Sequence, residues 1–155
     1  MNKTLAEIEA HSFAALTAKG QGDIAAVAAA HTAWLHGAGY NGIKYIAEAL
    51  QDAETKTLLE KDLMGLDLKG ISCVYISGEV EKLFAEHGRM FLRNVRHGLF
   101  LLPGSVTGNY GIGCPVDPGF ALGGERSKNP YAEKLEMAAR DGVDVDEALW
   151  QSLTG

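Results

Sequence analysis

The sequence predicts an α+β fold in which an N-terminal helical bundle packs on a small β-sheet. Residues 1–68 show helical spacing of apolar side chains, with capping residues and glycines at the ends of each run. Residues 71–77 and 98–102 are short runs typical of buried strands. A chain of 155 residues favours a single domain, 1–155, with a helical part at about 1–68 and a mixed α/β part at about 70–155.

Two helices are expected to open the chain. Thr4 and Glu7 have the spacing of a capping box, and apolar side chains follow on one helical face. Gly20 ends this helix, and Asp23 is expected to cap the next one. The second helix is dense in alanine, a strong helix former, and it ends at Gly37.

Two further helices complete the predicted bundle. Asn41 is placed to cap a short helix that carries Ile43 and Ile46. The leucine spacing predicts another helix over residues 52–63. Because the predicted turns are short, neighbouring helices should run roughly antiparallel.

The pattern changes after Gly70. Residues 71–77 are β-branched and aromatic, which predicts a strand, and residues 78–87 show helical spacing. Residues 89–95 fit a helix or a strand equally, and residues 98–102 are a short apolar run that predicts a second strand.

Two C-terminal helices are expected to finish the chain. Asn129 and Pro130 have the composition of a helix start, leading into a helix over residues 131–140. Asp141 and Gly142 should end it, and the spacing then predicts a last helix over residues 143–153.

The segment 98–124 stands apart because Asp117 is its one charged residue in 27 positions, in a chain that is 22% charged. It also holds eight of the 19 glycines and three of the four prolines. An exposed loop would be more polar, and a regular helix does not tolerate this glycine and proline content. We therefore expect an ordered, irregular segment packed against the core, a second subunit or a ligand.

Composition narrows the classes of function. The net charge of −6 and the absence of a basic cluster argue against nucleic-acid and anionic-membrane partners. No apolar run approaches the roughly 20 residues of a membrane span, and the N-terminus lacks the apolar region of a signal peptide. Cys73 and Cys114 have no metal-binding spacing, so reduced thiols in a cytoplasmic protein are expected.

The candidate catalytic residues are His97 and Asp117. Asp117 in an apolar segment is either a turn residue bonded to its own backbone or a carboxylate with a shifted pKa in a dry pocket. His97 beside Arg96 suits acid–base chemistry or anion binding, although a structural histidine fits as well. Asn109 and Tyr110 would supply hydrogen bonds to a ligand.

Residues 108–113, Gly-Asn-Tyr-Gly-Ile-Gly, are glycine-rich but match neither the dinucleotide fingerprint nor the phosphate-binding loop. Glycines in turns explain this pattern without a ligand, and no cofactor is expected. Cys114 follows directly, as a buried thiol or a ligand-binding residue.

Glu125 and Arg126 are the first charged residues after the 98–124 segment. They form either a solvated turn or side chains that close over a site. His31 and His36 are five residues apart, not the four that place two metal ligands on one helical face. His31 is therefore expected to be a hydrogen-bonded core histidine, and no metal site is predicted.

Four patches resemble an uncharacterised bacterial family known only as a domain of unknown function. They are residues 5–10 (Leu-Ala-Glu-Ile-Glu-Ala), 33–35 (Ala-Trp-Leu), 96–99 (Arg-His-Gly-Leu) and 142–150 (Gly-Val-Asp-Val-Asp-Glu-Ala-Leu-Trp). These patches carry a match that extends, in weak pieces, over about half of the chain. The resemblance implies a bacterial protein but no activity.

The N-terminal helices are also similar to those of the malate/L-lactate/sulfolactate dehydrogenase family. That family carries Ser-His-Gly after the corresponding helix, whereas residues 40–42 here are Tyr-Asn-Gly. The histidine that hydride transfer would need is therefore absent at this place. The resemblance implies shared helical packing without shared catalysis.

Three functions are compatible with these observations. The first is a non-enzymatic protein that binds a small ligand or assembles as a homo-oligomer through the 98–124 segment. The alternative is a small enzyme that uses His97 and Asp117 as an acid–base pair in a pocket formed by residues 96–126. The third is a degenerate relative of the dehydrogenase family, retained for an oligomeric or regulatory role.

Overall fold

The computed structural model describes residues 1–51, 59, 61–62, 65–88, 90–108 and 131–154. Its helices are α1 (Leu5–Ala18), α2 (Gly22–Gly37), α3 (Gly42–Ala49), α4 (Cys73–His87), the 3₁₀ helix η1 (Gly98–Leu101), α5 (Leu102–Gly108), α7 (Ala132–Asp141) and α8 (Glu147–Ser152). Its strands are β1 (Asn2–Lys3), β2 (Lys61–Asp62), β3 (Gly65–Asp67), β4 (Leu92–Arg93) and β5 (Val143–Asp144). The predicted α+β class, a helical bundle with a small sheet, is confirmed.

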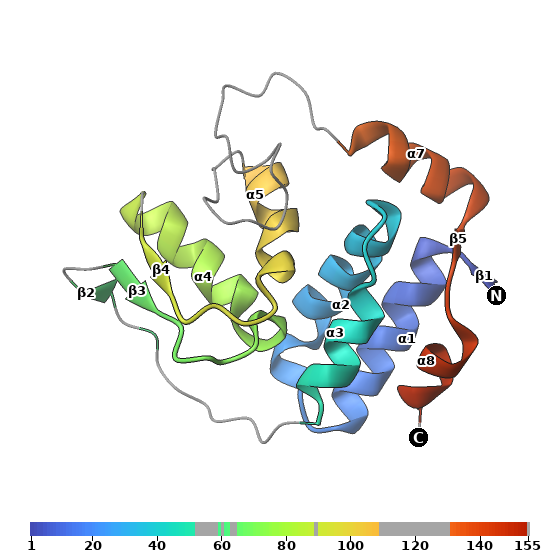
Figure 1. The fold of residues 1–155 in the computed structure, drawn as a ribbon, viewed down its shortest axis with the longest axis horizontal. Helices are drawn as coiled ribbons and strands as arrows, with labels where there is room; N and C mark the ends of the chain where they lie inside the picture. The colour runs from blue at the N-terminus through green and yellow to red at the C-terminus, as the bar shows by residue number, and fades with distance from the viewer. Residues whose placement is uncertain (52–58, 60, 63–64, 89, 109–130, 155) are drawn as a thin grey trace.

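Helices α1, α2 and α3 lie side by side, and α4 lies beyond them with strands β2 to β4 (Figure 1). Helix α5 stands between these two groups, and η1 contacts both α2 and α4. Phe100 of η1 is completely buried in the core that joins the groups. The core is therefore continuous from the N-terminal helices to the mixed half of the chain.

Local capping chemistry explains the N-terminal helices. The Thr4 hydroxyl accepts a hydrogen bond from the Glu7 N–H, and the Glu7 carboxylate accepts one from the Thr4 N–H, which confirms the predicted capping box. Asn41 caps α3 as predicted, because its side chain accepts from the Lys44 N–H. The prediction for Asp23 is wrong: Gln21 is the N-cap of α2 without a side-chain bond, and Asp23 lies in the first turn, where its negative charge favours the helix N-terminus.

The predicted strand at 71–77 is wrong, because most of this run forms the start of α4. Ser72 caps the helix by accepting from the Val74 N–H, and every residue from Ser72 to Ser77 is buried. A run that is apolar on all sides fits a buried helix as well as a buried strand, so its sequence period does not distinguish them. The predicted helix over 78–87 is confirmed as the rest of α4.

The predicted strand at 98–102 is also wrong, because the chain forms η1 and then α5 there. Leu99, Phe100 and Leu101 are buried, so the apolar run again reflects burial and not an extended backbone. Pro103 falls in the first turn of α5, the part of a helix that tolerates proline. Residues 98–108 are thus helical and not irregular, and residues 109–124 lie outside the described residues.

The sheet is built from other segments. Strand β2 pairs antiparallel with β3, and β3 pairs parallel with β4. Residues 61–62, predicted as helix, therefore form strand β2, and most of the rest of the predicted 52–63 helix is outside the described residues. The ambiguous stretch 89–95 contains β4.

The two ends of the described chain pair with each other. Strand β1 runs antiparallel to β5, with Asn2 opposite Asp144. The predicted helix over 131–140 is confirmed as α7, which ends at Gly142 with a φ of 74°. The predicted last helix begins later than expected, because Asp146 caps α8 by accepting from the Leu149 N–H and β5 precedes it.

Two helical glycines provide a matched test of this packing. A Cβ added at Gly42 would lie 2.9 Å from the Thr32 carbonyl oxygen, whereas one at Gly78 would make ordinary contact with Val27 at 3.5 Å. We expect Gly78→Ala to stabilise the protein by about 0.5–1 kcal/mol, because alanine loses less backbone entropy in a helix. We expect Gly42→Ala to destabilise it by about 1–3 kcal/mol, because α3 must move away from α2.

Urea unfolding of the two variants measures both effects. Equal free energies of unfolding for Gly42→Ala and Gly78→Ala would contradict the close approach of α3 to α2.

Candidate functional site

His97 lies where three segments of the chain meet. Its Nδ1 is 2.6 Å from Ser72 Oγ at the N-terminus of α4, and its Nε2 is 3.0 Å from Glu48 Oε2 in the last turn of α3. The His97 backbone has a φ of 54°, a left-handed conformation that costs energy in a residue other than glycine. The hydrogen bonds on both ring nitrogens hold the residue in this conformation.

The direction of both hydrogen bonds follows from the Glu48 carboxylate, which fixes which ring nitrogen donates. An ionised Glu48 carboxylate only accepts, so His97 Nε2–H donates to it. In a neutral imidazole Nδ1 then accepts from the Ser72 hydroxyl, whose oxygen also accepts from the Val74 N–H at 3.2 Å. Serine, imidazole and carboxylate in series are the groups that nucleophilic hydrolases use.

The relative burial of these three side chains argues against a hydrolase active site here. The side chains of Glu48 and His97 are 40% and 9% exposed, and Ser72 as a whole is 3% exposed. A nucleophile must reach its substrate, yet here the carboxylate faces solvent and the serine is the most deeply buried group. We therefore describe Ser72, His97 and Glu48 as the His97 clamp, which ties α3 and α4 to the start of η1.

A set of the same residue types occurs on α4, but there the glutamate oxygen nearest the ring, Glu81 Oε1, is buried without a hydrogen-bond partner among the described residues. His31 Nδ1 is 3.0 Å from Ser77 Oγ, and His31 Nε2 is 3.2 Å from Glu81 Oε1. Again the serine is the most buried group, at 1% exposed, and the glutamate side chain the most exposed, at 27%. His31 is the hydrogen-bonded core histidine that its sequence position predicts, and it links α2 to α4.

The remaining predicted site residues fall into two groups. Arg96 is half-buried, and its carbonyl oxygen accepts from the Cys73 N–H at 2.9 Å, so its backbone helps to place the start of α4. The structure thus brings Arg96 and His97 to the same end of α4. The other predicted residues lie outside the described residues: Asp117, Asn109, Tyr110, Cys114, Glu125 and Arg126.

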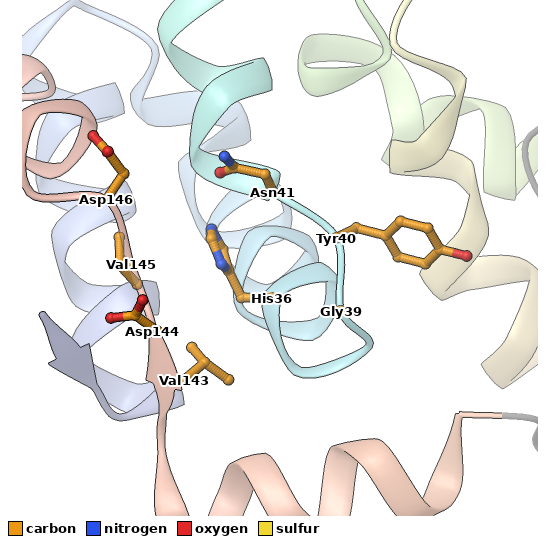
Figure 2. A pocket seen from close by; sticks show the side chains of 8 residues that line it. All are labelled: His36, Gly39, Tyr40, Asn41, Val143, Asp144, Val145 and Asp146. Atoms are coloured by element: carbon orange, nitrogen blue, oxygen red, sulfur yellow. The ribbon is translucent and has the colours of Figure 1, made fainter.

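An open cavity of about 360 Å³ lies between the turn from α2 to α3 and the segment from β5 to α8. Figure 2 shows the imidazole of His36 between these two walls, while the Tyr40 ring points away from the cavity. The Tyr40 hydroxyl is 2.9 Å from that of Tyr131. The residues that line the cavity are His36, Gly39, Tyr40, Asn41, Val143, Asp144, Val145 and Asp146.

His36 is the most buried polar residue of this lining, with 8% of its surface exposed. Its Nε2 accepts a hydrogen bond from the Ile43 N–H at 3.2 Å, so the ring nitrogen that carries the proton is Nδ1. Burial lowers the pKa of His36 to about 4, because the charged form loses hydration. His36 is therefore neutral at pH 7, and no other described residue accepts a hydrogen bond from Nδ1.

The other polar side chains of the cavity are partly engaged. Asn41 Oδ1 accepts from the Lys44 N–H, Asp146 Oδ1 accepts from the Leu149 N–H, and Asp144 Oδ1 lies 3.1 Å from the Met1 ammonium. Each keeps one further polar atom, an amide nitrogen on Asn41 and a second carboxylate oxygen on each aspartate. The cavity thus offers neutral donors on one wall and carboxylate acceptors on the other.

Sequence reasoning missed this cavity because its walls are about 100 residues apart in the chain. His36 entered the sequence analysis only through its spacing from His31. The local signal was present in part: the histidine precedes a glycine turn and a capping asparagine, Asn41. The opposite wall exists only because β5 pairs with β1, and no local pattern predicts that pairing.

Among the described residues, no group of three or more His, Cys, Asp or Glu side chains is arranged to hold a metal ion. No helix within those residues has the length and apolar character needed to cross a membrane.

Comparisons of the chain with protein-family models, curated proteins and solved structures found no match.

The buried neutral state of His36 predicts a pH dependence of stability. The pKa rises from about 4 in the folded protein to its ordinary value of 6.5 on unfolding, so the unfolded chain binds more protons between these values. Stability should therefore fall as the pH drops from 6.5 to 4, by about 2–3 kcal/mol through this residue. Urea unfolding across this range measures the loss.

His36→Gln is the matched variant for this measurement. The glutamine carbonyl reaches the position of Nε2 and accepts from the Ile43 N–H without titrating. Its stability should change less with pH than that of the wild type, and identical profiles for the two proteins would contradict the assignment.

The His97 clamp predicts a large effect at Ser72. Ser72→Ala removes the cap of α4 and the hydrogen bond between Ser72 Oγ and Nδ1 of His97, which should cost about 2–3 kcal/mol. Ser152→Ala is the control, because its exposed hydroxyl donates to the Leu149 carbonyl and should contribute less than about 0.5 kcal/mol. Chemical denaturation compares them, and rapid labelling of Ser72 by a fluorophosphonate in the folded protein would contradict its buried placement.

Proposed function

We propose that this protein is a non-enzymatic protein that binds a small molecule in the cavity at His36. The observation that carries the proposal is the His36 imidazole in the cavity wall, whose Nε2 is held by the Ile43 N–H, so that Nδ1–H is the ring donor left for a ligand. Nδ1 is not one of the buried side-chain atoms that lack a hydrogen-bond partner among the described residues, so this N–H is open to the cavity. A ligand with an acceptor atom would take this N–H in place of water.

The size and chemistry of the cavity support this proposal. A volume of about 360 Å³ is at the lower end of the range that small-molecule sites occupy. Val143 and Val145 supply apolar wall, and His36, Asn41 and Asp146 supply a few polar groups that would fix the orientation of a ligand. This combination of apolar wall and convergent polar groups is typical of binding sites.

The state of His36 favours binding over catalysis. An efficient general base has a pKa near the working pH and an available lone pair. The pKa of His36 is about 4, and its one unprotonated nitrogen, Nε2, already accepts from the Ile43 N–H. His36 therefore acts as a hydrogen-bond donor in this proposal and not as an acid or a base.

A fragment screen followed by protein NMR tests the proposal. We expect fragments that carry a hydrogen-bond acceptor to shift the amide signals of residues 39–41 and 143–146 together, because both walls belong to one cavity. His36→Gln keeps the bond to Ile43 through its carbonyl, but its amide N–H donors do not lie at the position of Nδ1–H. It should weaken binding by about 3- to 10-fold, the contribution of one hydrogen bond.

His87→Gln is the control, because His87 is exposed at the end of α4 and does not line the cavity. Its affinity for the same fragments should equal that of the wild type. Fragments that bind only elsewhere, or equal affinities for His36→Gln and His87→Gln, would contradict the proposal.

A further inference from the structure

The cavity's donors are both uncharged. His36 contributes Nδ1–H from a neutral ring, and Asn41 contributes its amide N–H groups because its oxygen is held by the Lys44 N–H. At the N-terminus of α3, the Ile43 and Lys44 N–H groups are taken by these two side chains. An anionic ligand would thus find these two N-terminal N–H groups of α3 already engaged.

The cavity's acceptors are carboxylates with one oxygen each already engaged. Asp146 Oδ1 caps α8 at 2.8 Å from the Leu149 nitrogen, and Asp144 Oδ1 is 3.1 Å from the Met1 ammonium. The second oxygen of each carboxylate remains to accept from a ligand. Asp144 lies at the open rim, with its side chain 93% exposed.

The charges around the cavity nearly cancel. Two positive groups oppose the two aspartates: the Met1 ammonium beside Asp144, and the Lys134 ammonium, whose Nζ is 3.5 Å from the place a Cβ would take at Gly39. A cationic ligand would meet the repulsion of these ammonium groups, and an anionic ligand that of the carboxylates. The surroundings therefore favour a ligand without net charge.

A hydroxyl group matches this arrangement better than other small polar groups. It accepts from an N–H such as that of His36 and at the same time donates to a carboxylate such as that of Asp146. Several hydroxyls on one small carbon skeleton would use both walls together. Resting on the proposed function, we infer that the ligand is an uncharged polyhydroxylated molecule of monosaccharide or cyclic-polyol size.

The test compares probes of one size and different charge. Glucose and myo-inositol are neutral, glucosamine is a cation, and glucuronate is an anion at neutral pH. Each is titrated into the full chain, and the shifts of the His36 imidazole and of amides 39–41 are followed by NMR. We expect saturable shifts with a neutral probe and at least about threefold weaker binding of both charged probes.

The results with the four probes test the ligand class separately from the proposed binding function. Tighter binding of glucosamine or glucuronate at the same residues overturns the ligand class and leaves binding at the cavity standing. Shifts from none of the four probes also overturn the ligand class, while the fragment screen still decides whether the cavity binds small molecules.

Two variants test the assigned donor on Asn41 and the assigned acceptor on Asp146, and both keep the helix caps. Asn41→Asp still caps α3 but replaces the donor with a carboxylate, so it should weaken binding of the neutral probe about 10-fold or more. Asp146→Asn still caps α8 but loses the charged acceptor, and we expect a loss of about 3- to 10-fold. Glu147→Gln, next to the cavity lining but not part of it, should bind as the wild type does. Unchanged affinity in both Asn41→Asp and Asp146→Asn would overturn the inference.

Discussion

The hydrogen bond from the Ile43 N–H to His36 Nε2 is the interaction on which the account of the site depends. It joins the last turn of α2 to the first turn of α3, where Gly42 allows the two helices to approach closely. The bond requires an unprotonated Nε2, and burial keeps the ring neutral by lowering its pKa. One structural contact thereby fixes both the turn and the position of the ring proton. The Nδ1–H donor of His36 at the cavity is therefore a consequence of the hydrogen bond that builds the turn from α2 to α3.

Polar side chains inside this small protein are used mainly to join helices. The His97 clamp ties α3 and α4 to η1, and Ser77, His31 and Glu81 tie α2 to α4. In both sets a buried serine, a histidine and a more exposed glutamate follow one another. Because the serines are buried, neither set presents a nucleophile. His36 differs from His31 and His97 because only one of its ring nitrogens is engaged within the described residues.

The parts of the fold that sequence reasoning predicted are those set by local chemistry. The Thr4–Glu7 capping box and the Asn41 cap depend on residues three positions apart, so the sequence contains the whole interaction. The errors at 71–77 and 98–102 share one cause: both runs are buried on all sides, and such runs lack the period that separates a strand from a helix. The cavity at His36 could not be predicted from local sequence patterns, because its second wall is positioned by the pairing of β1 with β5. The sequence singled out His97 as a candidate catalytic residue. Its partners Ser72 and Glu48 lie 25 and 49 residues away, so no local pattern identifies them.

The most direct test of the central claim is the tautomer of the His36 ring, read from its two nitrogen signals by long-range ¹H–¹⁵N NMR at pH 7. We expect a neutral ring with the proton on Nδ1 and an unprotonated Nε2, the state that accepts from the Ile43 N–H and presents an N–H donor to the cavity. A proton on Nε2, or a charged imidazolium at pH 7, would contradict both the buried hydrogen bond and the binding site built on it.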